Sequence, residues 1–324
     1  MKWGILSTGT IAKNFAQTAK QMPEVQLQAI ASRSRESAEA FAKTYGIPTA
    51  HDHYAALAND SDVEIVYVAT PHSRHYEDMK LLIEAGKHVL CEKSFTTDAK
   101  QAKEIFELAK KRNVFVMEAF WTKFIPLYRQ IETILESGEL GEIRAVTAQY
   151  GYTTVREARK FDPALAGGAL LDIGVYAIGF ACMMMGYAFD DVRGDMVMNS
   201  VGTDALDAIT LRRGKAVAQL TTAIGANMPT FGAVYGTKGH IDIPEFKNPT
   251  RAVLHLDGQE PVELVQPFDI NGFEYEIREA QACVEAGKMQ SERMTGEQTI
   301  AVMRIMDEIR RQNGFRFPFE ASDR

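Results

Sequence analysis

Residues 3–12, Trp-Gly-Ile-Leu-Ser-Thr-Gly-Thr-Ile-Ala, run from a short apolar strand through a turn into a helix. In that context the spacing follows the G-x-G-x-x-G/A fingerprint of dinucleotide-binding turns, with Ser7 at the first glycine position, Gly9 at the second and Ala12 at the third. A glycine at the second position lets the backbone approach a pyrophosphate, and the helix N-terminus supplies free N–H groups. The stretch therefore predicts a dinucleotide-binding turn, with an ordinary strand-to-helix turn as the alternative.

Strand and helix patterns alternate through the first 120 residues. Strands are expected over residues 3–7, 25–31, 62–69, 89–91 and 114–117, and helices over residues 11–21, 35–45, 74–85 and 98–112. Connections that contain a helix join parallel strands. Residues 1–122 are therefore expected to form a dinucleotide-binding Rossmann domain, an α/β fold with a doubly wound parallel sheet.

The pattern changes after residue 125. Longer strands are expected over residues 143–153, 208–213, 216–223, 231–235 and 251–256, and helices over residues 126–137, 169–185, 273–286 and 295–312. The pairs Arg213-Gly214 and Asp257-Gly258 are typical of hairpin turns, which join antiparallel neighbours. Residues 123–324 are therefore expected to form an α+β domain on a mostly antiparallel open sheet.

Composition limits the classes of partner and the compartment. The chain has 324 residues, 24% of them charged, and a formal net charge of -7. This charge argues against a nucleic-acid or anionic-membrane partner, and no apolar stretch is expected to reach the roughly 18 residues of a membrane-spanning helix. The N-terminal residues lack a signal-peptide cleavage site, and the three cysteines are widely spaced. These features predict a cytoplasmic protein with unpaired, buried thiols.

The segment after the second expected strand bears on the choice of cofactor. Residues 31–35 read Ala-Ser-Arg-Ser-Arg. NAD enzymes usually place an acidic residue here for the ribose 2′-hydroxyl, and this chain has none. Arg33, with Ser32 beside it, suits a 2′-phosphate because a guanidinium binds phosphate through two parallel hydrogen bonds. The segment favours NADP over NAD, with a solvated helix start as the alternative.

Two segments offer residues for proton transfer. Lys93 follows an apolar run at the carboxyl end of an expected central strand, the edge at which open α/β sheets bind ligands. Asp172 and Tyr176 lie four residues apart, so both are expected on one helix face. A tyrosine, whose pKa is about 10, needs a nearby cation for acid–base work at neutral pH, and Lys93 is expected to supply it across a cleft. The alternative is that Tyr176 is a core aromatic and Asp172 an acid favoured by the helix dipole.

The histidines of the first domain invite a metal interpretation. His51, His53, His72 and His75 have no cysteine or carboxylate cluster that completes a zinc set at familiar spacing. No metal site is therefore expected.

The segment over residues 153–163 is expected to influence substrate choice. The candidate residues in and just before it are Gly151, Tyr152, Arg156, Arg159 and Phe161, which either contact substrate or are exposed loop residues.

Four motifs together resemble the Gfo/Idh/MocA oxidoreductases, two-domain NAD(P) enzymes that act mainly on sugars, polyols and related hydroxy compounds. The motifs are residues 7–12, Thr70-Pro71-His72 with His75, residues 85–93, and the block Gly167-Gly168 with Asp172 and Tyr176. The resemblance keeps order and spacing over nearly the whole chain. Residues 3–7, 117–122 and 168–176 are most similar to the dimeric dihydrodiol dehydrogenase branch, which oxidises trans-dihydrodiols and aldoses such as D-xylose with NADP.

The resemblance implies roles for individual residues. It implies Lys93 and Tyr176 as the catalytic pair with Asp172 beside them, and Trp121 in an aromatic substrate pocket. It also implies that the second-domain sheet pairs subunits into a homo-oligomer, a dimer or a tetramer. The cofactor contacts expected from the motifs are Ser7, Thr8, Gly9, Thr10, Ile11, Ser32, Arg33, Thr70, Pro71, His72, His75, Glu92 and Lys93.

One position departs from the family pattern, which is Glu-Lys-Pro where this chain has Glu92-Lys93-Ser94. Loss of the proline frees the backbone after the lysine and restores an N–H. The predicted function is hydride transfer by an NADP(H)-dependent oxidoreductase, with Tyr176 as the acid/base and Lys93 lowering its pKa. An NAD-preferring sugar or inositol dehydrogenase, and a non-catalytic cofactor sensor on the same fold, remain alternatives.

Overall fold

The protein, described here from a computed structural model covering residues 1–153 and 158–322, divides into two compact units. The first comprises Met1–Trp121 and Asp269–Ile300, and the second comprises Thr122–Phe268 and Ala301–Arg324. The sequence predicted one boundary, after residue 122. The structure differs in one respect, because Asp269–Ile300, from late in the chain, belongs to the first unit.

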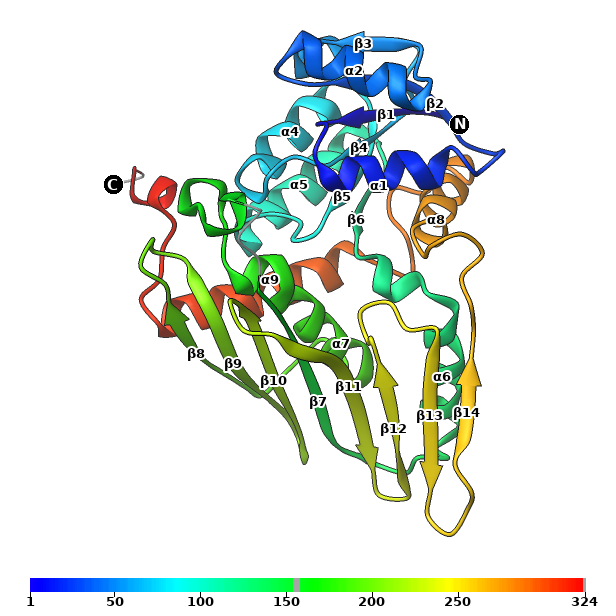
Figure 1. Ribbon diagram of the computed structural model, residues 1–324, viewed down its shortest axis with the longest axis vertical. Helices are drawn as coiled ribbons and strands as arrows, with labels where there is room; N and C mark the ends of the chain where they lie inside the picture. The colour runs from blue at the N-terminus through cyan, green and yellow to red at the C-terminus, as the bar shows by residue number, and fades with distance from the viewer. Residues whose placement is uncertain (154–157, 323–324) are drawn as a thin grey trace. The chain divides into compact units, whose positions relative to one another are not determined.

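The first unit contains a six-stranded parallel sheet (Figure 1). Its strands, in the spatial order β3-β2-β1-β4-β5-β6, are β3 (Thr49–His51), β2 (Gln26–Ala31), β1 (Lys2–Leu6), β4 (Ile65–Val68), β5 (His88–Glu92) and β6 (Val116–Ala119). Its helices are α1 (Thr10–Ala19), α2 (Arg35–Tyr45), α3 (Tyr54–Ala58), α4 (His72–Glu84), α5 (Ala99–Arg112) and α8 (Glu274–Glu285). Right-handed crossovers place α1 and α2 on one face and α4 and α5 on the other. The prediction of a doubly wound Rossmann sheet is confirmed.

Aromatic side chains fill the core of this unit. Phe15 on α1 stacks on Tyr67 of β4 with ring centroids 3.9 Å apart, and Trp3 of β1 lies 5.4 Å from Phe15. The Trp3 indole is fully buried and donates to Gln281 Oε1 at 2.9 Å. Because Gln281 lies on α8, this bond explains why Asp269–Ile300 belongs to the first unit.

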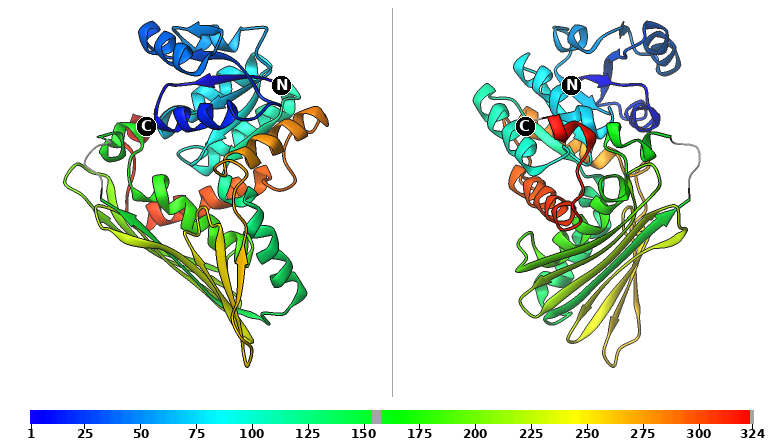
Figure 2. Two further views of the ribbon diagram at one scale, coloured as in Figure 1. Left: turned by 45° about the vertical axis from the view of Figure 1, so that its right-hand side comes forward. Right: turned by 90° about the vertical axis from the view of Figure 1, so that its left-hand side faces the viewer.

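The second unit contains an eight-stranded sheet. Its order is β14-β13-β12-β11-β7-β10-β9-β8, and every pairing is antiparallel except β7 with β10. The strands are β7 (Ile143–Tyr152), β8 (Asp191–Met198), β9 (Asp204–Arg213), β10 (Ala216–Ile224), β11 (Met228–Gly236), β12 (Gly239–Pro244), β13 (Arg251–Leu256) and β14 (Val262–Val265). The prediction of a mostly antiparallel sheet is confirmed. Figure 2 shows that α6 (Pro126–Ser137), α7 (Val175–Met185) and α9 (Gly296–Gln312) lie on one side of this sheet only.

Four strands, β3, β8, β12 and β14, were not expected from the sequence. β3 and β14 are short edge strands, and β12 runs between a glycine and a proline, which weaken a strand pattern. In β8 the interruption is Gly194, and a Cβ there would lie 2.7 Å from Ile309 Cγ2 of α9. Gly194 therefore weakens the strand pattern of β8 in the sequence, and the same glycine lets α9 pack closely on β8.

The sequence predicted that no apolar stretch would be long enough to span a membrane, and one helical segment shows that this prediction was wrong. Pro163–Met185 spans 23 residues and contains an 18-residue window of mean hydropathy 1.7, so it is long and apolar enough by composition. However, 89% of that window is buried inside the protein, and α7 packs on β7 and β10. The segment is a core helix of the second unit.

The prediction of unpaired, buried thiols is confirmed, because Cys91, Cys182 and Cys283 are all buried and free.

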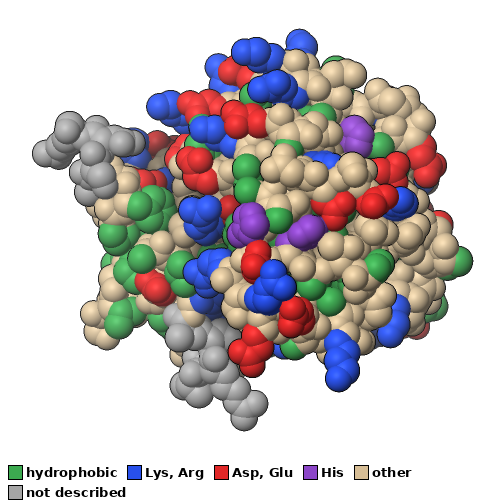
Figure 3. Space-filling model, turned by 90° about the horizontal axis from the view of Figure 1, so that it is seen from above, with side chains coloured by type: hydrophobic (Ala, Val, Ile, Leu, Met, Phe, Trp, Pro, Cys, Tyr) green, Lys and Arg blue, Asp and Glu red, His purple; other side chains and the backbone are tan. Residues whose placement is uncertain are grey.

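Basic and acidic side chains are mixed on the surface. Figure 3 shows basic and acidic side chains interspersed over the face that it draws.

Candidate active site

The strands of the parallel sheet end at one edge with the predicted cofactor residues. Ser7 follows β1, Ser32 follows β2, Thr70 closely follows β4 and Lys93 follows β5. All these strands run parallel, so their carboxyl ends share an edge. The strand order reverses between β1 and β4, and such a switch point is where open α/β sheets form a ligand crevice.

The turn from β1 to α1 fits a phosphate group. Gly9 is the N-cap of α1, no side chain caps the helix, and its first turn contains no acidic residue. A Cβ at Gly9 would meet only Ser7 Oγ, at 3.7 Å, so the space in front of the helix is open. Ser7 has a positive φ of 98°, and its N–H donates to Ala31 O at 2.9 Å. The free N–H groups of this helix end suit the pyrophosphate of a dinucleotide.

The end of β2 offers a cation that is not engaged elsewhere. Ser32 is buried, and its Oγ accepts from the Ser34 N–H at 3.4 Å. Arg33 is exposed and makes no hydrogen bond or ion pair with any other described residue. The nearby Asp52 is paired with Arg35 at 3.2 Å and with His53 at 2.7 Å. An accessible guanidinium without a competing carboxylate suits a 2′-phosphate.

The start of α4 holds the histidines. Pro71 is its N-cap, and His72 is its first residue and is buried. His75 is fully buried between two loops, with Nε2 2.8 Å from Thr70 O and Nδ1 2.9 Å from Ser94 O. A carbonyl oxygen only accepts, so a neutral imidazole donates to one of these two oxygens at a time. The predicted cofactor residue His75 therefore ties the loop after β4 to the residue after Lys93.

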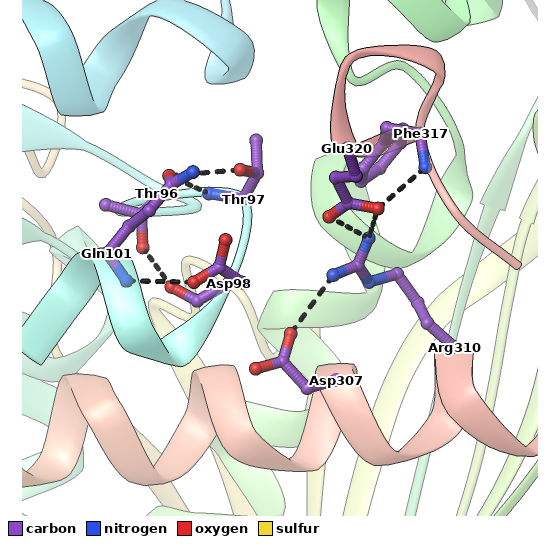
Figure 4. A network of polar contacts seen from close by, with 8 residues as sticks. All are labelled: Thr96, Thr97, Asp98, Gln101, Asp307, Arg310, Phe317 and Glu320. Atoms are coloured by element: carbon purple, nitrogen blue, oxygen red, sulfur yellow. Dashed lines mark hydrogen bonds and ion pairs between the residues drawn. The ribbon is translucent and has the colours of Figure 1, made fainter. Parts of the chain in front are cut away.

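The loop that follows Lys93 is fixed by hydrogen bonds from both ends. The Lys93–Ser94 peptide bond is cis. The Phe95 N–H donates to Glu118 Oε1 of β6 at 3.2 Å, and Thr299 Oγ1 donates to Glu118 Oε2 at 2.9 Å. Further along, Asp98 caps α5 by accepting from the Gln101 N–H at 2.8 Å (Figure 4).

Three buried carboxyl groups of the first unit, Glu92, Glu118 and Glu276, act on one another's charge. Glu92 accepts a short hydrogen bond from the Tyr67 hydroxyl. The pKa of Glu118 is raised to about 7: burial and the Glu92 charge raise it, while the hydrogen bonds from Thr299 and the Phe95 N–H and the Lys93 charge lower it. Glu276 on α8 is fully buried, and neither of its carboxyl oxygens has a hydrogen-bond partner among the described residues. Burial, followed by the charges of Glu92 and Glu118, raises the pKa of Glu276 well above its usual range.

Trp121 lies at the start of the 3₁₀ helix Trp121–Phe124, just beyond β6. Its ring packs on Phe273 with centroids 4.6 Å apart. The aromatic setting predicted for Trp121 is present within the first unit, and its contact with a substrate stays a prediction.

In the second unit Asp172 lies in a group of cations rather than at a simple helix end. Tyr152 donates its hydroxyl proton to Asp172 Oδ2 at 2.8 Å, and Lys160 Nζ donates to the Tyr152 oxygen at 2.6 Å. Lys160 Nζ also lies 3.4 Å from Asp172 Oδ2, and Arg159 lies 3.5 Å from Oδ1. Tyr152 and Arg159 thus meet a predicted site residue, whereas Arg156 lies outside the described residues.

The helix that carries Asp172 differs from the expected α-helix. Leu170–Gly174 forms a π-helix that continues into α7. Tyr176 lies in the first turn of α7, and its ring meets Tyr150 edge-on with centroids 6.3 Å apart. The four-residue spacing to Asp172 therefore does not define one α-helical face, because a π-turn has more residues per turn. Lys93 and Tyr176 belong to different units, and their pairing stays a prediction.

Two buried aspartates hold the turn in front of this π-helix. Asp204 Oδ2 accepts from the Leu170 N–H at 2.5 Å, and a Cβ on Gly168 would lie 1.9 Å from Asp204 Oδ1. Gly168 has a φ of 128°, which also demands glycine. Burial raises the pKa of Asp207 well above its usual range, and the Asp204 charge raises it further. The contact with the Asp204 carboxyl raises the pKa of Asp207 as well, whereas Thr222 lowers it.

Sequence reasoning missed these supporting groups, which are Glu118, Glu276, Lys160, Asp204 and Asp207. One signal was available, since Glu118 is an acidic residue inside an otherwise apolar strand. Such a residue needs a buried partner and so marks a special position. Lys160 had no comparable signal, because it reads as an ordinary loop cation.

These features define a two-unit protein whose first unit is built to bind a dinucleotide. Family models place it more closely: residues 1–120 match the oxidoreductase family with an NAD-binding Rossmann fold, and residues 128–242 match the GFO/IDH/MocA C-terminal domain. The chain is 34% identical over 327 residues to the trans-1,2-dihydrobenzene-1,2-diol dehydrogenase of Xenopus laevis, covering 98% of this chain and 99% of that one. The human protein of the same name is 32% identical over 330 residues, with 98% of each chain covered. The chain therefore belongs to the Gfo/Idh/MocA family of NAD(P)-binding oxidoreductases.

A solved structure agrees with this assignment. A 3-ketoreductase from Actinomadura kijaniata, in complex with NADP and TDP-benzene, matches with a TM-score of 0.88 at 28% identity, covering 96% of this chain and 97% of that one. The predicted fold and the NAD(P) class of cofactor are confirmed.

Proposed function

We propose that this protein is an NADP(H)-dependent oxidoreductase that moves a hydride between nicotinamide and a hydroxyl or carbonyl carbon of a sugar, polyol or trans-dihydrodiol. The observation that carries the NADP preference is Arg33, exposed at the end of β2 and without a carboxylate partner among the described residues. The substrate class rests on the relatives, which are named for a trans-dihydrodiol.

The chain's own residues supply binding and orientation. The turn from Ser7 to Ile11 holds the pyrophosphate at the open end of α1, and Ser32 and Arg33 hold the 2′-phosphate. When bound, nicotinamide supplies the hydride acceptor or donor, and the protein positions and polarises the substrate.

Proton transfer is assigned to Tyr176 and Lys93. In the oxidation direction the phenolate of Tyr176 takes the substrate hydroxyl proton while the hydride leaves the same carbon. The Lys93 ammonium stabilises the phenolate and orients the substrate oxygen. Asp172, held by Tyr152 and Lys160, orients the substrate from the second unit.

The test is a pair of substitutions with matched controls. Lys93→Met and Tyr176→Phe should each lower kcat on the order of 10²–10⁴-fold, the usual contribution of a general acid–base group. NADPH affinity, read by fluorescence titration, should change by no more than a few fold. Lys100→Met on the exposed face of α5 and Tyr235→Phe on β11 should keep wild-type turnover.

A double-substitution cycle tests whether the two residues act together. If they do, the double variant should be little worse than either single variant, because both remove the same step. If the two losses in kcat multiply in the double variant, Lys93 and Tyr176 do not act in the same step. A wild-type protein that binds NADPH tightly but turns over no aldose, ketose or vicinal diol would favour the cofactor-sensor alternative.

Cofactor preference has its own measurement. Arg33→Ala should weaken NADPH binding at least tenfold and leave NADH binding unchanged, because only NADPH has the 2′-phosphate. Arg35→Ala is the matched control, since that exposed guanidinium is already engaged by Asp52 and Glu39. Equal losses for both cofactors would favour the NAD-preferring alternative.

Two broader expectations stay predictions. We infer a homo-oligomer, either a dimer or a tetramer, paired through the face of the eight-stranded sheet that carries no helix. A light-scattering mass equal to that of one chain would contradict it. The cytoplasmic location likewise stays a prediction.

A further inference from the structure

A cluster of three potential metal ligands lies on strands β12 and β13 of the second unit. His240 and Asp242 are two residues apart on β12, so both side chains leave the same face of the sheet. His255 on β13 is the direct cross-strand partner of His240. Ile241 and Ile243, which alternate with these residues, are fully buried on the opposite face. The cluster therefore lies on the sheet face away from the core.

The three ligating atoms converge on one volume. Asp242 Oδ2 lies 3.9 Å from His240 Nε2 and 3.7 Å from His255 Nε2. All three atoms lie within 4.8 Å of one another. Ligands of a tetrahedral zinc ion, at bonds of about 2.0–2.1 Å, are roughly 3.3 Å apart. Side-chain rotations would close the remaining gap. Each of the three side chains is 33–38% exposed in the single chain, on the sheet face proposed above to pair subunits.

The surroundings favour a cation at this point. Among the described residues the two histidines are the only basic groups that pair with Asp242. The two imidazole rings are stacked, 8° apart in tilt with centroids 4.4 Å apart, so at least one ring must turn before both in-plane nitrogen lone pairs meet one ion. Tyr235 of β11 stacks on His240 at 5.7 Å. The cluster thus combines one negative charge with two nitrogen donors within reach of one ion.

We propose that His240, Asp242 and His255 bind one divalent transition-metal ion, with solvent in the remaining coordination position. Two imidazoles and one carboxylate suit zinc, cobalt, nickel or copper, whereas calcium and magnesium require mainly oxygen ligands. The ion would join β12 to β13 and change the local net charge from negative to positive. The site is separate from the residues assigned to hydride transfer and does not depend on that assignment.

The test uses the full-length, tag-free protein after treatment with a chelator. Equilibrium dialysis against Zn²⁺ at pH 7.5 should give one bound ion per chain, and Co²⁺ should produce the visible absorption bands of a low-symmetry site. Zn²⁺ should also raise the unfolding temperature, because an ion that binds only the folded state stabilises it.

Matched variants locate the site. His255→Gln and Asp242→Asn should each weaken Zn²⁺ binding at least tenfold and abolish the cobalt bands, with NADPH binding unchanged. His53→Gln is the control, because His53 is an exposed histidine 2.7 Å from Asp52 in the first unit without a second histidine. The proposal is overturned if wild-type protein takes up no ion, or if the His53 variant loses it while the His255 and Asp242 variants retain it.

Discussion

Lys93 and Asp172 are the charged centres of the two units, and their surroundings have opposite signs. The Lys93 charge acts on the buried Glu118 carboxyl, whose pKa the Glu92 charge raises. Asp172 lies between Lys160 and Arg159, with the Tyr152 hydroxyl donating to it. Each unit therefore supplies the counter-charges for its own central group.

The backbone beside Lys93 and the backbone beside Asp172 are held by the same kind of contact, a hydrogen bond from an N–H to a buried carboxyl group. In the first unit Glu118 accepts the Phe95 N–H beside Lys93, and in the second Asp204 accepts the Leu170 N–H beside Asp172. In both, the acceptor is a buried carboxyl from a different strand, well separated along the chain. The difference is in the neighbouring charge: the Lys93 charge lowers the pKa of Glu118, whereas the pKa of Asp207, next to Asp204, is raised by burial and then by the Asp204 charge.

The largest expected effect comes from breaking the Asp172 centre. Asp172→Asn removes a carboxylate 3.4 Å from the Lys160 ammonium, whose side chain is 12% exposed. Removing one partner of a buried ion pair typically costs about 3–5 kcal/mol in the free energy of unfolding. Urea unfolding should show a loss of this order, and Lys160→Met in the same chain should recover part of it.

An exposed ion pair provides the control for that comparison. Asp191→Asn removes the partner of Arg193, whose side chain is 77% exposed, and should cost less than about 1 kcal/mol. Equal losses for Asp172→Asn and Asp191→Asn would contradict the buried-pair interpretation.

The next effect is the pH dependence of the first centre. The Glu118 carboxyl loses its proton at a pH of about 7 in the folded protein and about 4.5 when unfolded. Its contribution to stability is therefore fully present below pH 4.5 and is lost as the pH rises through 7. A shift of this size corresponds to about 3 kcal/mol of unfolding free energy.

Glu118→Gln isolates that contribution, because an amide does not titrate. The difference in unfolding free energy between wild type and the variant should change by about 3 kcal/mol between pH 4.5 and 8. A difference that stays constant over this range would show that Glu118 is ionised throughout.

A smaller effect distinguishes the two aspartates of the second centre. In Asp207→Asn the amide can still donate to Asp204, so we expect a loss of less than about 1 kcal/mol in unfolding free energy. In Asp204→Asn the Leu170 N–H loses a charged acceptor, and we expect a loss of about 2 kcal/mol together with reduced kcat. Equal losses for the two variants would contradict this difference between the two aspartates.

The smallest effect concerns backbone conformation near each centre. Ser7 in the first unit and Ala166 in the second have positive φ values of 98° and 55°. Ser7→Gly should raise the unfolding free energy by no more than about 1 kcal/mol, because glycine adopts this region without strain. Ala166→Gly should gain less, since it also removes a fully buried methyl group. Thermal unfolding of both variants measures the difference, and a strong loss for Ser7→Gly would show that its hydroxyl matters more than the strain.

Local sequence was enough to predict the elements that carry the Rossmann pattern. The turn at residues 7–12, the helix Arg35–Tyr45 and the lysine after β5 follow from spacing, caps and apolar runs. The strands that were not predicted, such as β8 and β12, contain residues that interrupt the strand pattern. In β8 that residue is Gly194, which is required by a distant contact with Ile309. A local pattern cannot report a contact with a residue more than a hundred positions away.

The sequence by itself determined the fold class, the dinucleotide turn, the free buried cysteines and the identity of the charged residues Lys93 and Asp172. Only the tertiary structure decided what surrounds those charges: the Glu118 and Asp204 anchors, the Lys160 and Tyr152 partners of Asp172, and the His240–Asp242–His255 cluster. The physical reason is the range of each interaction. Helix caps, turns and apolar periodicity act between neighbours in the chain, whereas burial, charge pairing and metal-ligand geometry depend on segments that only folding brings together.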